Sequence, residues 1–460
     1  MMSVTRPQAR NIIKHIPGST PFAKRNIFCP LDAFYMIFDE ILFEKILVHT
    51  NEMLKDRGEP QITIIDLKKF VGLVILAGSM NSNMESIKWM WNENYGRKIF
   101  PSTMTKRMFS RITQNMRFDN FRSRRINNCN DKLQPIRWIF ERVIKNSQKL
   151  MKPGESVTVD EQLIPFRGRC SFKQYIPSKP AKYGIKVWCL NDSKNSFLYN
   201  AEIYCGKRNG VREKDQGENV VLRLLDGFYL QGLNITCDNF FTTYSLARKL
   251  IAKKMTIVGT IRKNRKELPP IQNIIPGQSE YFQSDGVTLL QFAPKKNKQV
   301  HLLSTFHNNQ FQTESTKPEI VDFYNKTKGG VDCMDMMINN YTTKRISRRW
   351  PMTCFYNIID IALLNSYIVF KDIFPSFFPK NCKPRRYFID LVAISMIETN
   401  TEETKECSSI AKKVKVGNFK VKGRCYLCPR TLDRKQRKTC SLCKKHICED
   451  HCNFVCDNCK

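Results

Sequence analysis

The chain contains few acidic residues for its length. Its 460 residues include 42 Asp and Glu but 76 Lys and Arg, which gives a formal net charge of +34. Such a positive excess repels itself unless it meets a polyanion, so it favours nucleic acid as the partner over an anionic membrane surface or an acidic protein. A hydrophobic content of 42% and an aromatic content of 11% supply enough apolar surface for buried cores. These proportions exclude a wholly disordered protein.

A long hydrophobic run is also missing. A membrane span needs roughly 18 to 20 consecutive apolar residues, whereas the most apolar stretch, FVGLVILAG at Phe70 to Gly78, has the length of a core helix. Residues 1–20 contain no apolar segment of the kind that a signal peptide requires. We therefore expect an intracellular protein without a membrane partner. The sequence has no internal repeat, which excludes a solenoid or a propeller.

Cysteine is not scarce, but its distribution argues against a disulfide framework. Eight of the eighteen cysteines fall between Cys425 and Cys459, and the other ten are scattered among apolar neighbours. This pattern is typical of a reducing compartment, with one metal-binding module and ordinary buried thiols.

The hydrophobic pattern changes its period along the chain. Over residues 30–152 apolar residues recur at helical spacing, as in LDAFYMIFDEILFEKILVHT, and Pro153-Gly154 ends the block. The segments SVTVDEQL, YGIKVWCLND, SFLYNAEIYCG, LNITCDNFF and MTIVGTI are then predicted as strands, with helices before and after the fourth. A mixed sheet covered by helices is the most economical arrangement of these elements. Short β-like runs follow at 263–317, and a helical stretch returns at 349–378.

Two of the predicted strands end in aspartate. Asp160 ends the run SVTVD and Asp238 ends LNITCD. One such residue means little, because Asp often caps a turn, but two carboxylates on neighbouring strands converge into an oxygen site for Mg²⁺ or Mn²⁺. In GGVDCMDMM, Asp332 and Asp335 share one face of a predicted helix, and either could complete the site. Such a set suits two-metal phosphoryl transfer.

Glu161, Arg167 and Arg169 accompany Asp160 in the segment DEQLIPFRGRC. Because side chains alternate along a strand, Glu161 should point away from the metal site. We expect it to form a structural salt bridge to a nearby arginine. Arg167 and Arg169 flank a glycine in a predicted turn, where they either hold substrate phosphates or pair with Glu161, and the sequence favours neither alternative.

Four cations precede a tryptophan in the segment KRISRRWP; they are Lys344, Arg345, Arg348 and Arg349, and the tryptophan is Trp350. An exposed tryptophan beside arginines can stack on an unpaired base while the cations hold the nucleic-acid backbone. The structural alternative, which the sequence alone favours, makes Trp350 the first core residue of the following helix.

The C-terminal tail carries four close pairs of metal ligands, which are Cys425 and Cys428, Cys440 and Cys443, Cys448 and His451, and Cys456 and Cys459. Eight ligands at this spacing indicate two tetrahedral Zn²⁺ ions. We favour an interleaved cross-brace in which the first and third pairs share one ion and the second and fourth share the other, with His446 and Cys452 as spare ligands. Residues 411–460 stay basic after zinc binding, so the module either grips phosphates or is a structural domain whose lysines form a solvated face or a nuclear-import signal.

Several segments together resemble the signature segments of the piggyBac-type transposases. They are VDEQLIPFRGRCSFKQYIPSKPAKYGIKVW, NITCDNFFTT, TIVGTIRKN, YNKTKGGVDCMD and RRWPM. Their order and spacing along the chain also resemble those of the family. The resemblance extends over about residues 30–460. It implies that Trp350 lies beside the DNA at the cleavage site. It also implies a catalytic set, which by motif is Asp160, Asp238, Asp332 and, as an additional nearby acid, Asp335.

The resemblance implies a multidomain α+β fold. An RNase H-like mixed β-sheet core with helices is interrupted by a small β-rich insertion, helical segments precede and follow the core, and a cross-brace zinc domain completes the chain. The expected parts are a flexible basic arm (1–29), a helical dimerisation and DNA-binding domain in two parts (30–153 and 342–398), the catalytic core in two parts (154–262 and 318–341), the β-rich insertion (263–317), a basic linker (399–424) and the cysteine-rich zinc domain (425–460).

The resemblance also implies a function. Members of the family cut and paste DNA through hairpin intermediates and insert at TTAA, with Mg²⁺ or Mn²⁺ at the aspartates and two Zn²⁺ in a tail that recognises transposon ends. We therefore expect a nuclear homodimer that binds double-stranded DNA. The family usually has a long acidic N-terminal region, whereas this chain begins almost at the helical block. A truncated copy, a fragment and a host-adopted DNA-binding derivative without mobility therefore remain open. In a third interpretation the tail is a RING- or PHD-like interaction module.

Overall fold

Most of the chain between residues 12 and 398 is described in the computed structural model. The described residues are 12–126, 131–207, 211, 213–270, 274–307, 317–398 and, towards the C-terminus, 423–425, 428, 432, 435–436, 446 and 448. The linker expected at 399–424 therefore lies outside the described residues, except for Gly423 and Arg424, which form β12.

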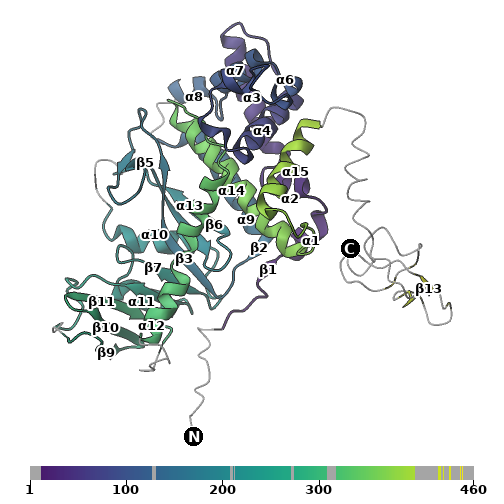
Figure 1. Ribbon diagram of the computed structural model, residues 1–460. Helices are drawn as coiled ribbons and strands as arrows, with labels where there is room; N and C mark the ends of the chain where they lie inside the picture. The colour runs from purple at the N-terminus through teal and green to yellow at the C-terminus, as the bar shows by residue number, and fades with distance from the viewer. Residues whose placement is uncertain are drawn as a thin grey trace.

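In the described part of the chain one large mixed sheet has nine strands, and it lies at the left of Figure 1. Its strands are β3 (Ser156–Pro165), β4 (Gln174–Tyr175), β5 (Tyr183–Asp192), β6 (Leu198–Ile203), β7 (Asn234–Cys237), β8 (Thr256–Thr260), β9 (Ser279–Ser284), β10 (Val287–Lys295) and β11 (Lys298–Ser304). Their order across the sheet is β4, β5, β3, β7, β8, β11, β10, β9, and β6 pairs with β5.

Strands β3, β7 and β8 run parallel to one another. Helix α10 (Gln216–Leu224) precedes β7, and α11 (Tyr244–Ala252) joins β7 to β8. Parallel neighbours need such crossover connections, because the chain must return to the same end of the sheet. On the other side of β3, strands β5 and β6 pair antiparallel. This arrangement confirms the predicted mixed sheet with helices between its strands.

The expected β-rich insertion at 263–317 does not form a sheet of its own. Strands β9, β10 and β11 make an antiparallel meander, and β11 pairs with β8, where Leu303 lies opposite Gly259. The segment therefore extends the edge of the core sheet. Its sequence shows short strands but not their pairing partner, because the hydrophobic pattern of a strand does not specify which edge it joins.

A block of helices precedes the sheet. It contains α2 (Pro30–Ile37), α3 (Glu40–Asp56), α4 (Ile64–Ser79), the 3₁₀ turn η2 (Ser82–Met84), α5 (Ile87–Met90), α6 (Ile99–Thr103), α7 (Lys106–Asn115), α8 (Phe121–Ile126) and α9 (Gln134–Leu150). Helix α4 begins with a capping box, since Thr63 and Asp66 bind each other's backbone N–H groups. Its residues from Phe70 to Ser79 are all buried, which confirms the predicted core helix.

In the described part of the chain, four helices follow the sheet strands. They are α12 (Glu319–Thr327), α13 (Gly330–Asn340), α14 (Trp350–Ile373) and α15 (Pro384–Glu398). Helix α15 packs on α4, where a Cβ at Gly72 would lie 3.0 Å from the carbonyl oxygen of Ala393. The helical block is therefore built from two distant parts of the chain.

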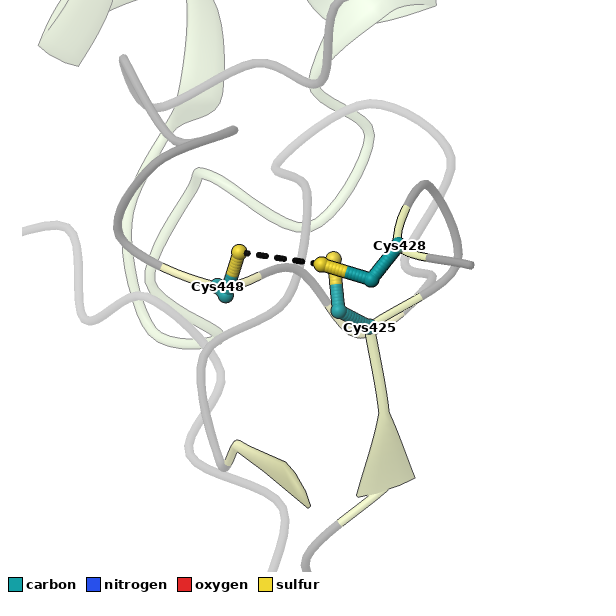
Figure 2. A group of neighbouring side chains, drawn as sticks. All are labelled: Cys425, Cys428 and Cys448. Atoms are coloured by element: carbon teal, nitrogen blue, oxygen red, sulfur yellow. Dashed lines mark hydrogen bonds between the residues drawn. The ribbon is translucent and has the colours of Figure 1, made fainter. Parts of the chain in front are cut away.

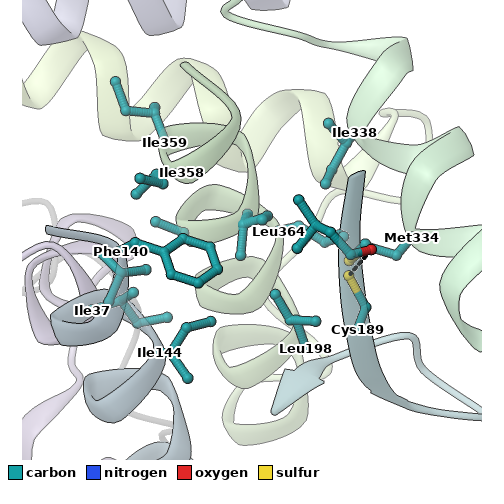
Figure 3. Close-up of a cluster of buried hydrophobic side chains, with 14 of the residues drawn as sticks. Ile37, Phe140, Ile144, Cys189, Leu198, Met334, Ile338, Ile358, Ile359 and Leu364 are labelled. Atoms are coloured by element: carbon teal, nitrogen blue, oxygen red, sulfur yellow. Dashed lines mark hydrogen bonds between the residues drawn. The ribbon is translucent and has the colours of Figure 1, made fainter. Parts of the chain in front are cut away.

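Helix α14 connects the helical block to the sheet (Figure 1). Figure 3 shows its apolar side chains Ile358, Ile359 and Leu364 among residues of three other parts of the core. Those residues are Ile37, Phe140 and Ile144 of the block, Cys189 and Leu198 of the sheet, and Met334 and Ile338 of α13. By length and composition α14 could cross a membrane, but 94% of its most apolar 18-residue window is buried inside the protein. The helix confirms the helical stretch predicted at 349–378.

The N-terminal arm is anchored in part. Strand β1 (Gly18–Ser19) pairs antiparallel with β2 (Met151–Lys152), and α1 (Pro21–Asn26) follows with Thr20 as its N-cap. The Ser19 N–H also donates to Asp372 of α14 at 2.8 Å. The expectation of a flexible arm over 1–29 is therefore wrong from Gly18 onward. The short segment GSTP has no periodicity from which these contacts could be predicted.

Candidate active site and cysteine cluster

Asp160 and Asp238 are adjacent on two parallel strands. In the parallel register of β3 and β7, Val159 lies opposite Cys237. The next residue of each strand is an aspartate, so the two acids lie at the same height on the same face of the sheet. The backbone N–H of Glu161 donates to Asp160 Oδ1 at 2.7 Å and orients that carboxylate.

The carboxylate of Asp238 also closes the turn that ends β7. Its Oδ1 accepts a hydrogen bond from the backbone N–H of Phe240 at 2.8 Å. Its backbone carbonyl accepts from the N–H and the hydroxyl of Thr242 at 3.1 and 2.8 Å. An aspartate that binds the backbone two residues further on forms an Asx-turn. The turn therefore holds this acid at the carboxyl end of the strand.

Helix α13 approaches the same face and adds two acids. A Cβ at Gly330 would lie 2.6 Å from Thr158 Oγ1, so glycine permits the close approach of α13 to β3. Further along the helix, Asp335 Oδ1 accepts a hydrogen bond from Gln162 Nε2 at 2.6 Å. The side chain of Asp332 is 70% exposed. Helix α13 therefore brings Asp335 against the strand and leaves Asp332 towards solvent.

Burial raises the pKa of the three inner acids. Burial, the charge of Glu161 and the charge of Asp238 raise the pKa of Asp160 to about 7. Burial is also the main cause of the raised pKa of Asp238 and of Asp335, where the hydrogen bond from Gln162 acts in the opposite direction. Neighbouring carboxylates in a partly buried site disfavour one another's charge, and a divalent cation offsets this cost. The hard oxygen donors present here fit Mg²⁺ or Mn²⁺.

A lysine that the sequence interpretation missed lies among these acids. Lys179 Nζ donates to the backbone carbonyl of Glu161 at 3.0 Å and lies 3.7 Å from Asp332 Oδ1. Its positive charge lowers the pKa of Asp160 and Asp335, against the larger effect of burial. Lys179 lies within the longest family-like segment, but its local pattern does not distinguish it from the neighbouring lysines.

Glu161 lies near a lysine instead of the expected arginine. Glu161 Oε2 is 3.8 Å from Lys186 Nζ of β5, and the same ammonium group lies 5.0 Å from the centre of the Phe240 ring. The predicted partners Arg167 and Arg169 follow the end of β3. The expected salt bridge of Glu161 to an arginine is therefore wrong, because its cationic neighbour is Lys186 and the two arginines lie beyond the end of the strand.

Two of the arginines predicted to contact DNA point into the protein instead. Arg345 donates to the backbone carbonyls of Ser82 and Glu85 at 3.0 and 2.5 Å. Arg349 donates to carbonyls at the end of α7, including that of Gln114 at 3.1 Å. Burial lowers the pKa of both groups, to about 10 for Arg349. These contacts tie the segment before α14 to the helical block, so both arginines have a structural role.

Lys344 and Trp350 also make contacts within the protein. Lys344 Nζ donates to the carbonyl of Pro165 at 2.5 Å. Trp350 is the first residue of α14, and its ring meets the ring of Phe172 edge-on at 5.1 Å. The indole is partly buried in the core, as in the structural alternative, and part of it remains accessible.

The other predicted cations line a groove beyond the end of β3. Arg167, Arg169 and Arg348 are exposed, and with Lys173, Lys344 and the largely buried Arg345 they line a groove of about 1160 Å³. The described residues that line it include no Asp or Glu. The structure thus places these arginines on a basic surface and away from Glu161.

Three cysteines of the C-terminal tail lie together (Figure 2). The Sγ atoms of Cys425, Cys428 and Cys448 are all within 4.8 Å of one another, and those of Cys428 and Cys448 are 3.6 Å apart. Two thiolates on one tetrahedral Zn²⁺, with bonds of about 2.3 Å, lie about 3.8 Å apart, so the cluster fits zinc. The ring of His446 packs against Gly423 of β12 (Gly423–Arg424), which pairs with β13 (Lys435–Gln436). The remaining predicted ligands lie outside the described residues, and these are Cys440, Cys443, His451, Cys456, Cys459 and the spare Cys452.

A comparison with protein families identifies the class to which this fold and these acids belong. The family described as Transposase IS4 matches residues 29–367. The matched range contains β3, β7 and α13, which carry the aspartates. The chain therefore belongs to this transposase family.

More specific similarities give the type within the family. PiggyBac transposable element-derived proteins 3 and 2 of Homo sapiens are 20% identical over 367 residues and 23% identical over 364 residues. Each match covers 74% of this chain, and the chain spans 61% of the length of each relative. A cryo-EM structure of a piggyBac transposase synaptic complex with hairpin DNA is 28% identical, with a TM-score of 0.79, and the match covers 97% of this chain and 100% of that chain. The chain is a piggyBac-type member, which confirms the resemblance.

Proposed function

We propose that the chain is a metal-dependent DNA transposase of the cut-and-paste type. The observation that carries the proposal is the convergence of Asp160 and Asp238 on neighbouring parallel strands, with Asp335 and Asp332 supplied by α13. Mg²⁺ or Mn²⁺ held by these carboxylates would supply the charge that activates the attacking oxygen and stabilises the leaving oxygen of a phosphoryl transfer. Asp160, Asp238 and Asp332 are the proposed metal ligands, and Asp335 is the additional acid.

The order of the strands supports an RNase H-like identity for the core. Across the sheet the core strands run β6, β5, β3, β7, β8. Strands β3, β5 and β6 pair antiparallel in succession, whereas β7 runs parallel to β3 and β8 parallel to β7, and a helix precedes each of these two. This is the strand order of the RNase H fold, and it puts an acid on the central strand beside an acid at the end of its parallel neighbour.

Each inner residue has a role that follows from its position. Asp160 within β3 and Asp238 directly after β7 present carboxylates at the same height on one face of the sheet, where a DNA phosphate can approach. Lys179 offsets part of the negative charge and lies at the same rim as Asp332. Because the acids would otherwise repel the DNA backbone, this cation lowers the barrier to its approach, and a metal held by the acids would lower it further.

Double-stranded DNA is the proposed partner. The groove lined by Arg167, Arg169 and Arg348 begins at Pro165, five residues from Asp160, which is about 17 Å along a strand. That distance is short on the scale of a DNA duplex, so one duplex can occupy the groove and reach the acids. We infer transposon ends as the substrate, hairpin intermediates, a TTAA target, a homodimeric assembly and nuclear localisation. The hairpin DNA of the similar piggyBac synaptic complex and the net charge of +34 support this substrate class.

The C-terminal tail is proposed as a cross-brace zinc domain that binds two Zn²⁺ ions and helps to recognise the transposon ends. The cluster of Cys425, Cys428 and Cys448 supports this proposal, because it would supply three ligands of the first site. The basic charge of the tail suits contact with phosphates.

Cleavage of transposon-end DNA by the full chain tests the proposal. Inverted repeats flanked by TTAA around its gene supply the substrate. With Mg²⁺ the wild type should nick and join this DNA, and Asp160→Ala, Asp238→Ala and Asp332→Ala should each abolish both steps. Asp226→Ala, an exposed acid in the turn after α10, is the control that should keep full activity. Activity that survives any one of the three substitutions would refute the catalytic assignment.

A host-adopted DNA-binding protein without mobility is the second candidate. The names of the similar human proteins, which describe them as derived from a transposable element, favour it. A cellular excision assay separates the two candidates. DNA binding without excision supports the immobile host-adopted protein, and seamless excision excludes it. If the full chain captures neither a ubiquitin-conjugating enzyme nor a histone-tail peptide, a RING- or PHD-like role for the tail is removed as well.

A further inference from the structure

A buried amide connects helix α14 to an acid of the candidate active site. Gln162 lies on β3 two residues after Asp160, on the same face of the strand, and is 2% exposed. Its Nε2 donates to Asp335 Oδ1 at 2.6 Å, and its Oε1 accepts from Nδ2 of Asn357 in α14 at 3.1 Å. Three side chains therefore form a continuous hydrogen-bonded chain from α14 through β3 to α13.

Both ends of this chain determine the orientation of the Gln162 amide. Because Asn357 offers an N–H group, Gln162 turns its oxygen towards α14 and its nitrogen towards Asp335. The reversed amide would place an oxygen against a carboxylate oxygen, which gives two acceptors without a proton between them. Gln162 therefore acts as a donor and restrains the plane of the Asp335 carboxylate.

The other two inner acids are oriented in a similar way. The N–H groups of Glu161 and Phe240 bind Oδ1 of Asp160 and Asp238, respectively. Asp335 lies within a helix, where the nearby backbone N–H groups are used in the helix itself. A side-chain donor must therefore orient its carboxylate, and Gln162 of β3 supplies it. In the described part of the chain, no donor reaches the second oxygen of Asp335, which leaves that oxygen for a ligand.

We propose that Gln162, oriented by Asn357, is the positioning residue that holds Asp335 in place for cation binding. This inference rests on the proposed function, because it treats the acids as a cation site. Residues that orient a metal-binding side chain typically contribute about 10- to 100-fold to metal affinity. The sequence pattern does not indicate this role, since a glutamine beside DE is an ordinary strand residue.

Binding of Mn²⁺ to the zinc-loaded full chain, measured by electron paramagnetic resonance, tests the inference without any catalysis. Gln162→Leu has a similar volume but lacks the amide, and it should weaken Mn²⁺ binding about 10- to 100-fold. Asn357→Leu should weaken it less, because the donor remains and only its orientation is lost. The double variant should bind no more weakly than Gln162→Leu, since both residues act through one hydrogen bond.

Asn191→Leu is the matched control. Asn191 is a fully buried amide of β5 that touches α13 through Met334 Sδ at 3.1 Å, away from the carboxylate. Its loss should lower stability and leave Mn²⁺ affinity unchanged. Wild-type affinity in Gln162→Leu and Asn357→Leu, or an equal loss in Asn191→Leu, would overturn the inference. A wild-type chain that binds Mn²⁺ with this dependence on Gln162 but cleaves no DNA would instead refute the proposed function and support the positioning role.

Discussion

Replacement of Arg345 by methionine tests whether this arginine serves folding or DNA binding. Its guanidinium group donates two hydrogen bonds to carbonyls of the helical block, and the residue is 8% exposed. A hydrogen bond from a charged group contributes about 1.5–3 kcal/mol, whereas burial of the charge acts against this gain. Methionine retains an apolar stem but leaves two carbonyls without their donor. We expect Arg345→Met to lower the free energy of unfolding by about 2–5 kcal/mol.

Arg348→Met is the matched comparison, three residues away. Arg348 is exposed and lines the basic groove. Its loss should change the free energy of unfolding by less than about 0.5 kcal/mol. It should weaken DNA binding and reduce the slope of log K against log salt by about 1. Urea denaturation measures the stability, and fluorescence anisotropy at several salt concentrations measures the slope. Unchanged stability of Arg345→Met, together with a salt slope reduced by about 1, would refute its structural role.

Three other substitutions test separate contacts. Gly330→Ala would place a Cβ 2.6 Å from the Thr158 hydroxyl of β3, so urea denaturation should show that the free energy of unfolding falls by about 1–3 kcal/mol. Gly329→Ala is the control, because its Cβ would lie 3.6 Å from one sulfur atom, and it should change the free energy of unfolding little. Burial raises the pKa of Asp360 from 3.8 to about 6, so the folded state holds this proton more tightly than the unfolded state. The resulting stabilisation is complete at low pH and is lost as the pH rises from about 4 to about 6, and Asp360→Asn should remove up to about 3 kcal/mol of this pH dependence in urea titrations. Cys428→Ser should reduce the zinc content of the chain from two ions to one in a colorimetric assay of denatured protein, while the exposed Cys333→Ser should leave it unchanged. Equal effects in a variant and its control, or an unchanged pH profile at position 360, would contradict the corresponding contact.

The part of the fold that follows from local pattern could be predicted. Alternating apolar residues and intervening helices indicated the mixed sheet, because side-chain period and connection length are visible in a sequence. The structure places Asp160 within β3, which continues to Pro165, so the prediction that this acid ends a strand is wrong, whereas Asp238 directly follows β7. The meeting of the two acids then required only that β3 and β7 be neighbours. Their parallel pairing supplies that condition.

The remainder depends on contacts between distant segments. Arg345 and Arg348 occur in one basic run, yet one binds carbonyls of the helical block and the other is exposed. Lys179 joins the acids through the folding of a loop, and Gln162 obtains its role from partners 173 and 195 residues away. No local pattern of charge or hydrophobicity contains this information. For the same reason the sequence showed the strands at 263–317 but not that they extend the core sheet.

The packing of α15 on α4 has a consequence for how the protein is made. Ser79 of α4 donates to Asp390 of α15, and the two residues are 311 positions apart. At a synthesis rate of about 5–20 residues per second, α15 is synthesised about 15–60 seconds after α4, so the face of α4 beside Gly72 stays uncovered for that time. During that interval an apolar surface is available to chaperones and proteases. A message interrupted before the codons of α15 would therefore yield a product cleared by quality control, and a cell should not accumulate a stable N-terminal fragment that competes with the full-length protein.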